Sequence, residues 1–470
     1  MQLTRINNFN AIYILLISYV IIASFIIWFF DGTGDSGDSI THYLFAKFAP
    51  LHPELFFDHW AKPVYVLLAS PFAQFGFAGV KIFNSIVTLL TIFFTFKIVQ
   101  KLNLKNAIFV AILLIFSPKY FALTFSGLTE PLFALFISIS LYATLLKKNI
   151  SASILVSFLP FIRSEGLIII GVYGLYFLLT KKWKYIPLLL IGHVAYSLVG
   201  YFVHHDILWV FTKIPYAHLS SPYGSGNLLH FTNQLYHIIG VPIYILFVFG
   251  IISIVLKSIK KELTPEIQIL VFFGFISFFI AHTLFWYLGI FNSMGLGRVL
   301  IAVMPLISII SLFGFNFITE DLLKHKRIPK LITQVLLISY ILIFPFTSNP
   351  AAIHWEKDMK LTQDQKAAVK AVDYINQNIQ RKTRYVFANV YLSHILNVDY
   401  FDDNKRLNLN SCNMNQINPG DIIIWENWSA LVDYGVTKEC LDINPDLINL
   451  YNSSDKNQDH EILYSIYKYK

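Results

Sequence analysis

Residues Ala11–Phe30 read AIYILLISYVIIASFIIWFF and contain no charged side chain. About 20 such residues are enough for an α-helix to cross the hydrocarbon layer of a membrane. No small-residue cleavage site follows, and further apolar runs such as Val80–Phe96 come later, which predicts a retained helix rather than a signal peptide. Only 14% of the 470 residues are charged and 56% are hydrophobic, whereas soluble domains have about 25% charged residues. The sequence therefore predicts an α-helical polytopic membrane protein.

The distribution of lysine and arginine predicts how the chain crosses the membrane. With the N-terminus inside, 16 Lys and Arg residues fall in inside loops and seven in outside loops, as the positive-inside rule requires. This orientation leaves the C-terminal tail outside, and we expect an integral protein of a bacterial inner membrane. Eleven spans are predicted, at about 11–30, 79–99, 106–118, 128–146, 150–163, 165–180, 185–204, 240–256, 266–289, 298–318 and 330–346.

The net charge of +8 is unevenly distributed along the chain. Residues 1–349 hold 23 Lys and Arg against 12 Asp and Glu, a net of +11, whereas residues 350–470 hold 13 against 16, a net of −3. Because the basic excess lies in the membrane part, it serves topology and no nucleic-acid partner is expected. We predict a transmembrane domain at 1–348, with a catalytic outer loop at 31–78, and a soluble domain at 349–470.

The polar tail has the pattern of a small α/β domain. A helical pattern covers 361–379. Cys412 and Cys440, the two cysteines of the chain, both lie in this tail. An extracytoplasmic location permits a disulfide between them, and two unpaired thiols are the equally weighted alternative. Strands are predicted at 384–390, 421–425, 447–451 and 461–468.

The first outer loop is the richest in groups that exchange protons. It begins DGTGDSGDSITHY over 31–43 and includes Asp58-His59-Trp60-Ala61-Lys62-Pro63. A helix that starts after Asp38 would place this carboxylate at the positive end of the helix. The density of Asp, His and Trp favours a catalytic loop over the alternative, a solvated connection.

Two arginines on the outer side run against the positive-inside trend. Arg163 lies in the segment Arg163-Ser-Glu165-Gly166, and Arg298 follows Gly295-Leu-Gly297. Each guanidinium can bind a phosphate through its planar fork, or can simply anchor a helix at the membrane surface. Together with Lys62 they predict a site for a lipid phosphate. Glu130 opens another span at this level, as a partner of an arginine or substrate hydroxyl, or only as a helix-start acid.

Other catalytic and metal-binding patterns are missing from the sequence. There is no Gly-rich phosphate loop, no Gly-x-Ser-x-Gly elbow and no His-Glu-x-x-His. We therefore expect no required cofactor, although Asp35, Asp38 and Asp58 offer ligands for a divalent metal.

Several short motifs resemble the GT-C superfamily of membrane glycosyltransferases. Asp38-Ser-Ile-Thr-His42-Tyr43 resembles its acidic outer-loop motif, with Ser39 where many relatives have Glu. The segment from Asp58 to Pro63 is similar to a loop of protein O-mannosyltransferases and lipid A aminoarabinose transferases, with Val64 in place of a second proline. The segments at Thr129-Glu130-Pro131 and Arg163-Ser-Glu165-Gly166 resemble glycosylphosphatidylinositol mannosyltransferases, and Arg298 with Pro305 resembles a late motif.

The resemblance implies an inverting transfer of a sugar from a polyprenyl-phosphate carrier to a hydroxyl of a glycan, lipid or protein. Asp38 would be the general base, and Asp58 and His42 would orient the acceptor or tune Asp38. The residues expected to bind substrate are Lys62, Glu130, Arg163, Glu165 and Arg298. The alternatives are a transporter or flippase of lipid-linked sugars, and an O-antigen ligase or polymerase.

Overall fold

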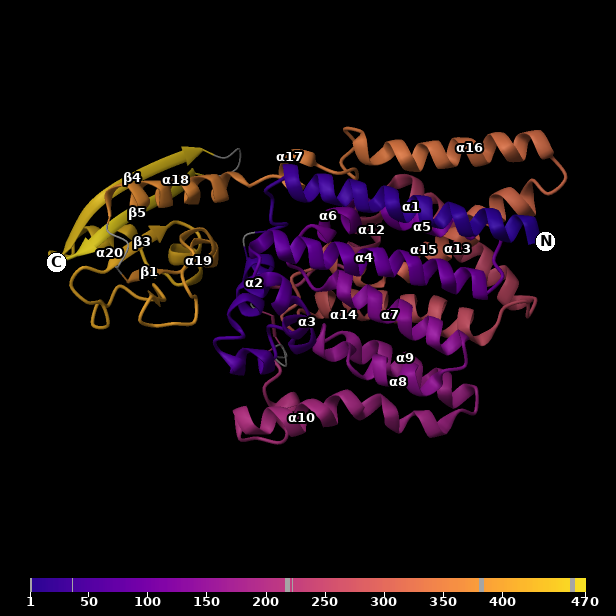
Figure 1. The fold of residues 1–470 in the computed structure, drawn as a ribbon, viewed down its shortest axis with the longest axis horizontal. Coiled ribbons are helices and arrows are strands. Elements are labelled where there is room, and N and C mark those ends of the chain that lie inside the picture. The colour runs from indigo at the N-terminus through magenta and orange to yellow at the C-terminus, as the bar shows by residue number, and fades with distance from the viewer. Residues whose placement is uncertain (1, 36, 216–219, 222, 380–383, 457–460) are drawn as a thin grey trace.

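A computed structural model describes residues 2–35, 37–215, 220–221, 223–379, 384–456 and 461–470. Apolar helices lie side by side in one bundle, and a domain with a β-sheet sits at one end of it (Figure 1). In the described residues, seven helical segments are long and apolar enough to cross a membrane: Asn10–Phe29, Gly76–Lys101, Trp183–His204, Val241–Ile259, Glu266–Leu288, Gly297–Leu322 and Arg327–Phe346. The chain is therefore an integral membrane protein, as its composition predicts.

The predicted number of eleven spans is not confirmed. The predicted span at 106–118 contains only the short helix α5 (Phe109–Ile115), and it ends where α6 (Pro118–Thr124) begins. Pro118 lacks the N–H that would continue α5 and instead opens the next helix. Three further predicted spans appear as shorter apolar helices, α7 (Glu130–Leu145), α8 (Asn149–Ser157) and α9 (Gly166–Leu179).

The centre of the bundle is a helical segment made of η6 (Gly297–Val303) and α15 (Met304–Asn316). Every residue of α15 is buried, as expected for a helix that is apolar on all sides. It packs closely against α13 (Val241–Ile259), where a Cβ atom on Gly314 would lie 1.8 Å from the carbonyl oxygen of Leu246. Small residues permit such close helix contacts in membranes. The tight packing fixes the segment that carries Arg298.

The first outer loop folds into short helices at the end of the bundle nearest the sheet domain (Figure 1). They are α2 (Asp38–Phe48), η1 (Pro53–Phe57) and α3 (Pro63–Ala73), and they lie between α1 (Gln2–Phe29) and α4 (Gly76–Lys101). Further helices of this part are α10 (Ile191–His204), α11 (Trp209–Thr212), α12 (His230–Ile239), η5 (Glu266–Phe273), α14 (Gly274–Leu288), η7 (Phe317–Leu322), α16 (Arg327–Ile343) and α17 (Trp355–Asp358). Four short helical turns are η2 (Leu159–Phe161), η3 (Trp183–Tyr185), η4 (Pro187–Leu190) and η8 (Phe344–Phe346).

The C-terminal domain is an α/β unit, as predicted. Its five-stranded sheet has the order β2-β1-β3-β5-β4, with parallel pairing around β1 and antiparallel pairing around β5. The elements are α18 (Gln363–Asn378), β1 (Tyr385–Phe387), α19 (Val390–Leu396), β2 (Arg406–Leu407), β3 (Ile422–Glu426), α20 (Lys438–Asp442), β4 (Leu447–Lys456) and β5 (Glu461–Tyr469).

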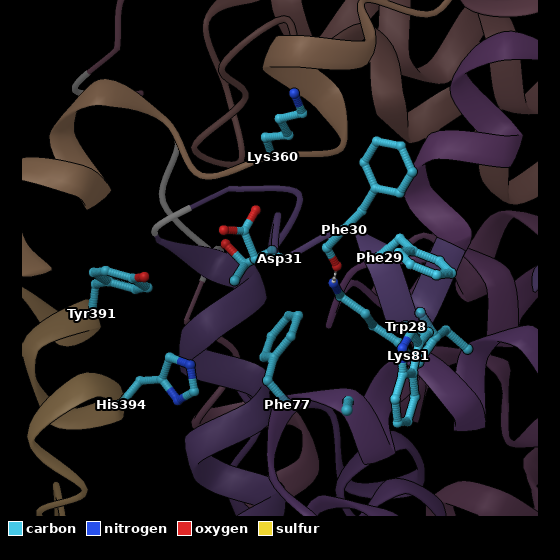
Figure 2. A pocket seen from close by; sticks show the side chains of 12 residues that line it. Trp28, Phe29, Phe30, Asp31, Phe77, Lys81, Lys360, Tyr391 and His394 are labelled. Atoms are coloured by element: carbon cyan, nitrogen blue, oxygen red, sulfur yellow. Dashed lines mark hydrogen bonds between the residues drawn. The ribbon is translucent and has the colours of Figure 1, made fainter. Parts of the chain in front are cut away.

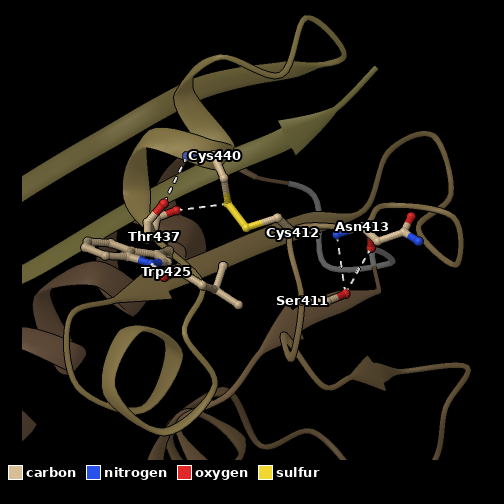
Figure 3. Close-up of a disulfide and its surroundings, with 7 residues drawn as sticks. Ser411, Cys412, Asn413, Trp425, Thr437 and Cys440 are labelled. Atoms are coloured by element: carbon tan, nitrogen blue, oxygen red, sulfur yellow. Dashed lines mark hydrogen bonds between the residues drawn. A yellow bond between two sulfur atoms is a disulfide. The ribbon is translucent and has the colours of Figure 1, made fainter.

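One strand of this domain differs from the sequence prediction, and the state of the two cysteines decides between the two predicted alternatives. The strand predicted at 384–390 ends early, because the side chain of Asn389 accepts a hydrogen bond from the Tyr391 N–H at 3.0 Å and so caps α19. Cys412 and Cys440 form a disulfide (Figure 3). The alternative of two free thiols is therefore wrong.

The C-terminal domain docks onto the outer loop. His52 of the loop lies 3.0 Å from the carboxylate of Asp399, and Lys47 donates a hydrogen bond of 2.7 Å to Asn397. The rings of Phe45 and Phe401 pack edge to face between these polar contacts. The domain boundary predicted between 348 and 349 and the limits of the catalytic loop stay predictions.

Candidate active site

The start of α2 is organised by two acidic residues of the outer loop. One oxygen of Asp35 accepts hydrogen bonds from the N–H groups of Gly37, at 3.1 Å, and Ser39, at 2.8 Å. Asp38 is the first residue of the helix, and its side chain is 46% exposed. Asp35 therefore satisfies the free N–H groups of the helix end, which leaves the Asp38 carboxylate accessible.

Arg298 joins these two carboxylates. One terminal nitrogen of its guanidinium donates to Asp35 at 2.5 Å, and the other donates to Asp38. The inner nitrogen, Nε, lies 3.8 Å from the carboxylate of Glu130. Glu130 opens α7 and is fully buried. Arg298 thus brings together acids of the outer loop and the bundle.

Arg163 also pairs with Glu130. Its guanidinium lies 2.9 Å from a carboxylate oxygen of Glu130 and donates at 2.9 Å to Glu165. His282 of α14 lies 3.7 Å from the same Glu165 oxygen. A buried carboxylate is costly unless it is paired, and the Oε1 atom of Glu130 lies within 4 Å of both arginines, at 2.9 Å from Arg163 and 3.8 Å from Arg298. The cluster therefore has two guanidinium groups that share one buried acid.

Lys62 reaches this cluster from the second part of the outer loop. Its ammonium group donates hydrogen bonds to the Ser164 hydroxyl at 3.1 Å and to the His59 carbonyl at 3.3 Å. Its backbone is left-handed, with φ of 68°, a strained conformation that is common at functional sites. Burial lowers the pKa of Lys62 to about 8.

Asp58 and His42 lie next to the cluster and make contacts of different kinds. Asp58 accepts a hydrogen bond of 2.8 Å from the Ala61 N–H and so closes the turn before Lys62. His42 lies one helical turn after Asp38, is buried, and stacks on Trp60 with 4.9 Å between ring centroids. Burial lowers the pKa of His42 to about 3, with Asp38 opposing the shift and nearby cations adding to it. His42 is therefore neutral at pH 7.

All eight predicted site residues thus lie at one end of the bundle, and most of them are in contact. Arg298, Asp38, Glu130, Arg163 and Glu165 form a continuous chain of ion pairs. Asp35, which the sequence analysis offered only as a possible metal ligand, and His282 also belong to this cluster. The sequence signal for Asp35 is its position four residues before Ser39, because its carboxylate accepts a hydrogen bond from the Ser39 N–H. The roles assigned to these residues stay predictions.

The side chains offer little for a metal ion. Across the described ranges, no three His, Cys, Asp or Glu residues are grouped so that they could hold one. The oxygens of Asp35 and Asp38 face Arg298 instead.

A cavity of about 520 Å³ lies beside the cluster, between α1, α4 and the C-terminal domain (Figure 2). Its wall includes Asp31, Lys81 and His394, and the Lys81 ammonium donates to the Phe30 carbonyl at 2.9 Å. Neither Arg298 nor Asp38 lines it. Thr33 lines it and lies only two residues from Asp35.

No protein-family model and no curated protein matches the chain. Among solved structures, the chain is similar to ArnT from Cupriavidus metallidurans in the apo state, with a TM-score of 0.63 and 9% identity over 96% of this chain and 97% of that chain. An Archaeoglobus fulgidus oligosaccharyltransferase with a tethered acceptor peptide gives a TM-score of 0.47 and 12% identity, over 81% and 63%. The chain therefore shares its overall fold with ArnT.

Proposed function

We propose that this protein is an inverting glycosyltransferase. It moves a sugar from a polyprenyl-phosphate carrier to an acceptor hydroxyl, at the extracytoplasmic face of a bacterial inner membrane. The observation that carries the proposal is the contact of Arg298 with Asp38, which places a phosphate-binding group beside an accessible carboxylate. The fold shared with ArnT supports glycosyl transfer in general.

Asp38 acts as the general base. It takes the proton of the acceptor hydroxyl while this oxygen forms a bond to the anomeric carbon of the sugar. The bond between that carbon and the phosphate oxygen breaks on the opposite face, so the configuration inverts and the electron pair stays on the phosphate. Base catalysis of this kind contributes about a hundred- to ten-thousand-fold.

Arg298, Arg163 and Lys62 stabilise the leaving phosphate. The phosphate gains negative charge as the bond to the sugar breaks, so its interaction with these cations is strongest in the transition state. Arg298 forms ion pairs with Asp35 and Asp38. The donor phosphate exchanges with Asp38 at Arg298, which releases the carboxylate to accept a proton.

The acids between the cations set their geometry. Glu130 holds the guanidinium of Arg163 at 2.9 Å and has Arg298 at 3.8 Å, so it fixes the spacing of the two phosphate-binding groups. Glu165 holds the other side of Arg163. Asp58 and His42 support Lys62 and the face of α2 that carries Asp38.

The arrangement favours an enzyme over a transporter. Ionisable residues that mark a transport pathway are expected near the middle of the membrane, whereas these predicted site residues gather at the end of the bundle that carries the outer loop. An O-antigen ligase or polymerase would be expected to use a large late outer loop. The cluster here depends on the first outer loop, which supplies Asp35, Asp38 and Lys62.

The test uses the purified full-length protein in lipid nanodiscs. Undecaprenyl-phosphate mannose, glucose and aminoarabinose are supplied with a membrane extract as acceptor, and released undecaprenyl phosphate is measured. Release that requires the protein, with inverted configuration in the product, is expected. The same protein is also placed in proteoliposomes, and undecaprenyl-diphosphate sugars are supplied in parallel. Movement of lipid-linked sugar across the proteoliposome membrane without release would favour the flippase, and turnover of the diphosphate-linked donors alone would favour the ligase.

A further inference from the structure

The C-terminal domain reaches the candidate active site through one buried side chain, that of Gln365 on α18. This side chain is 1% exposed, and its amide nitrogen donates a hydrogen bond of 2.7 Å to the hydroxyl of Thr33. Its amide oxygen accepts from the Thr362 N–H at 3.0 Å. Because a backbone N–H can only donate, the orientation of the amide is fixed and the nitrogen must face Thr33.

Thr33 in turn forms hydrogen bonds with the loop that carries Asp35 and Asp38. Its hydroxyl donates to the carbonyl of Asp35 at 2.7 Å, and its own carbonyl accepts from the Ser39 hydroxyl at 2.5 Å. The Ser39 oxygen in turn accepts from the Gly127 N–H at 2.7 Å. Thr33 and Ser39 are both buried. Thr33 is therefore held by the C-terminal domain, and Ser39 is held by the bundle.

The backbone around this segment leaves little room for movement. A Cβ atom on Gly32 would lie 2.5 Å from the backbone of Met359, and a Cβ atom on Gly127 would lie 2.2 Å from the carbonyl oxygen of Ser39. The Gly32 N–H donates to the Met359 carbonyl at 2.8 Å. Packing therefore brings the loop close to both neighbours, while the hydrogen bonds of Thr33 set its orientation.

From these contacts we infer that Gln365 is a positioning residue that holds Asp35 and Asp38 in register with Arg298. Its amide fixes Thr33, Thr33 fixes the carbonyl of Asp35, and Asp35 caps the helix that Asp38 begins. The C-terminal domain thereby completes the active site without supplying a group that touches the substrate. This inference rests on the proposed transferase function for its kinetic consequence.

Three variants separate the positioning contact from the stability of α18. Gln365→Glu keeps the oxygen that accepts from Thr362 but removes the donor to Thr33. Thr33→Val removes the same contact from the other side. Thr362→Ala is the matched control, because it deletes the hydroxyl that caps α18 and leaves the Gln365 amide and its contact with Thr33 in place.

The full-length proteins are compared in nanodiscs by donor turnover and by hydrogen exchange at Gly37 and Ser39, whose N–H groups bond to Asp35. Gln365→Glu and Thr33→Val are expected to lower kcat about ten- to a hundred-fold, with donor KM unchanged and faster exchange at both amides. The double variant should be no slower than the slower single variant, because both single variants already remove the hydrogen bond between Gln365 and Thr33. Thr362→Ala should lower the Tm without these effects.

The outcomes separate the two proposals. If the wild-type protein turns over donor, and both variants keep its kcat and its exchange rates, the positioning role is overturned. If Thr362→Ala lowers kcat as much as Gln365→Glu, the effect comes from helix stability and the inference is also wrong. If the wild type releases no undecaprenyl phosphate from any donor, the proposed function fails. In that case the hydrogen-exchange rates at Gly37 and Ser39 alone test whether Gln365 positions the loop: faster exchange in the variants supports this role, and unchanged exchange overturns it.

Discussion

The guanidinium of Arg298 donates a hydrogen bond to the carboxylate of Asp38, 260 residues away in the chain. Arg298 lies in the helical segment that continues into the buried helix α15, and Asp38 begins a helix of the outer loop. The contact therefore ties the loop to the most rigidly packed part of the bundle. It also places the predicted base and a predicted phosphate-binding group within reach of the same substrate.

Replacement of either arginine should weaken donor binding. Lysine keeps the charge but cannot bond two carboxylates or a phosphate in the bidentate way of a guanidinium. Arg163→Lys and Arg298→Lys are therefore expected to raise the donor Kd, and the alanine variants to lower kcat by about a hundred-fold or more. Lys213→Ala, outside the cluster, is the control. Unchanged donor affinity in both alanine variants would remove the arginines from the phosphate site.

Activity should fall in alkaline solution because of Lys62. Its pKa is lowered to about 8 by burial, so the ammonium group carries its charge below pH 8 and loses it as the pH rises through this value. The free enzyme should therefore show a fall in kcat/KM near pH 8. Lys62→Arg should keep its charge and shift this limb upward. If the fall in kcat/KM stays at the same pH in Lys62→Arg, a group other than Lys62 causes it.

The C-terminal domain should lie outside the cytoplasm. The positive-inside distribution of Lys and Arg motivates this expectation. A periplasmic reporter fused after Asn349 should be active, and a cytoplasmic reporter at the same position should be silent. The reverse result would place the whole candidate site on the wrong side for the proposed donor.

The disulfide between Cys412 and Cys440 should stabilise the same domain. It closes a loop of 28 residues, for which the chain-entropy relation gives about 3 to 4 kcal/mol. Cys412→Ser/Cys440→Ser should lower the Tm of the domain, and the native protein should show no reactive thiol after denaturation. Two freely alkylated cysteines in protein from its own membrane would contradict the disulfide.

The sequence was informative where chemistry is local. Uncharged runs predicted the helices, and the position of Asp38 before a helical pattern placed it at the start of α2. The sidedness of Arg163 and Arg298 placed them at the same end of the bundle. The end of the predicted span at residue 118 was also local, because Pro118 cannot continue α5 and opens α6 there.

Contacts between distant segments of the chain could not be predicted from the sequence. Nothing near Asp35 indicates that it would share Arg298 with Asp38, because that pairing depends on how η6 packs beside the outer loop. The same holds for Gln365, which reads as an ordinary helix-capping residue of a polar tail and yet reaches Thr33. Such contacts depend on the packing of whole elements, which periodicity does not encode.

The most direct test of the account is donor turnover by Asp38→Asn, beside Asp31→Asn, Asp35→Asn and Asp58→Asn. Asparagine keeps the size of Asp38 and an acceptor for Arg298 but removes its basicity. We predict that Asp38→Asn abolishes transfer while the protein still folds and binds undecaprenyl-phosphate sugar. Asp31→Asn and Asp35→Asn should be milder, and Asp58→Asn intermediate. Near-native kcat in Asp38→Asn, in a preparation where the wild type is active, would contradict the proposed mechanism.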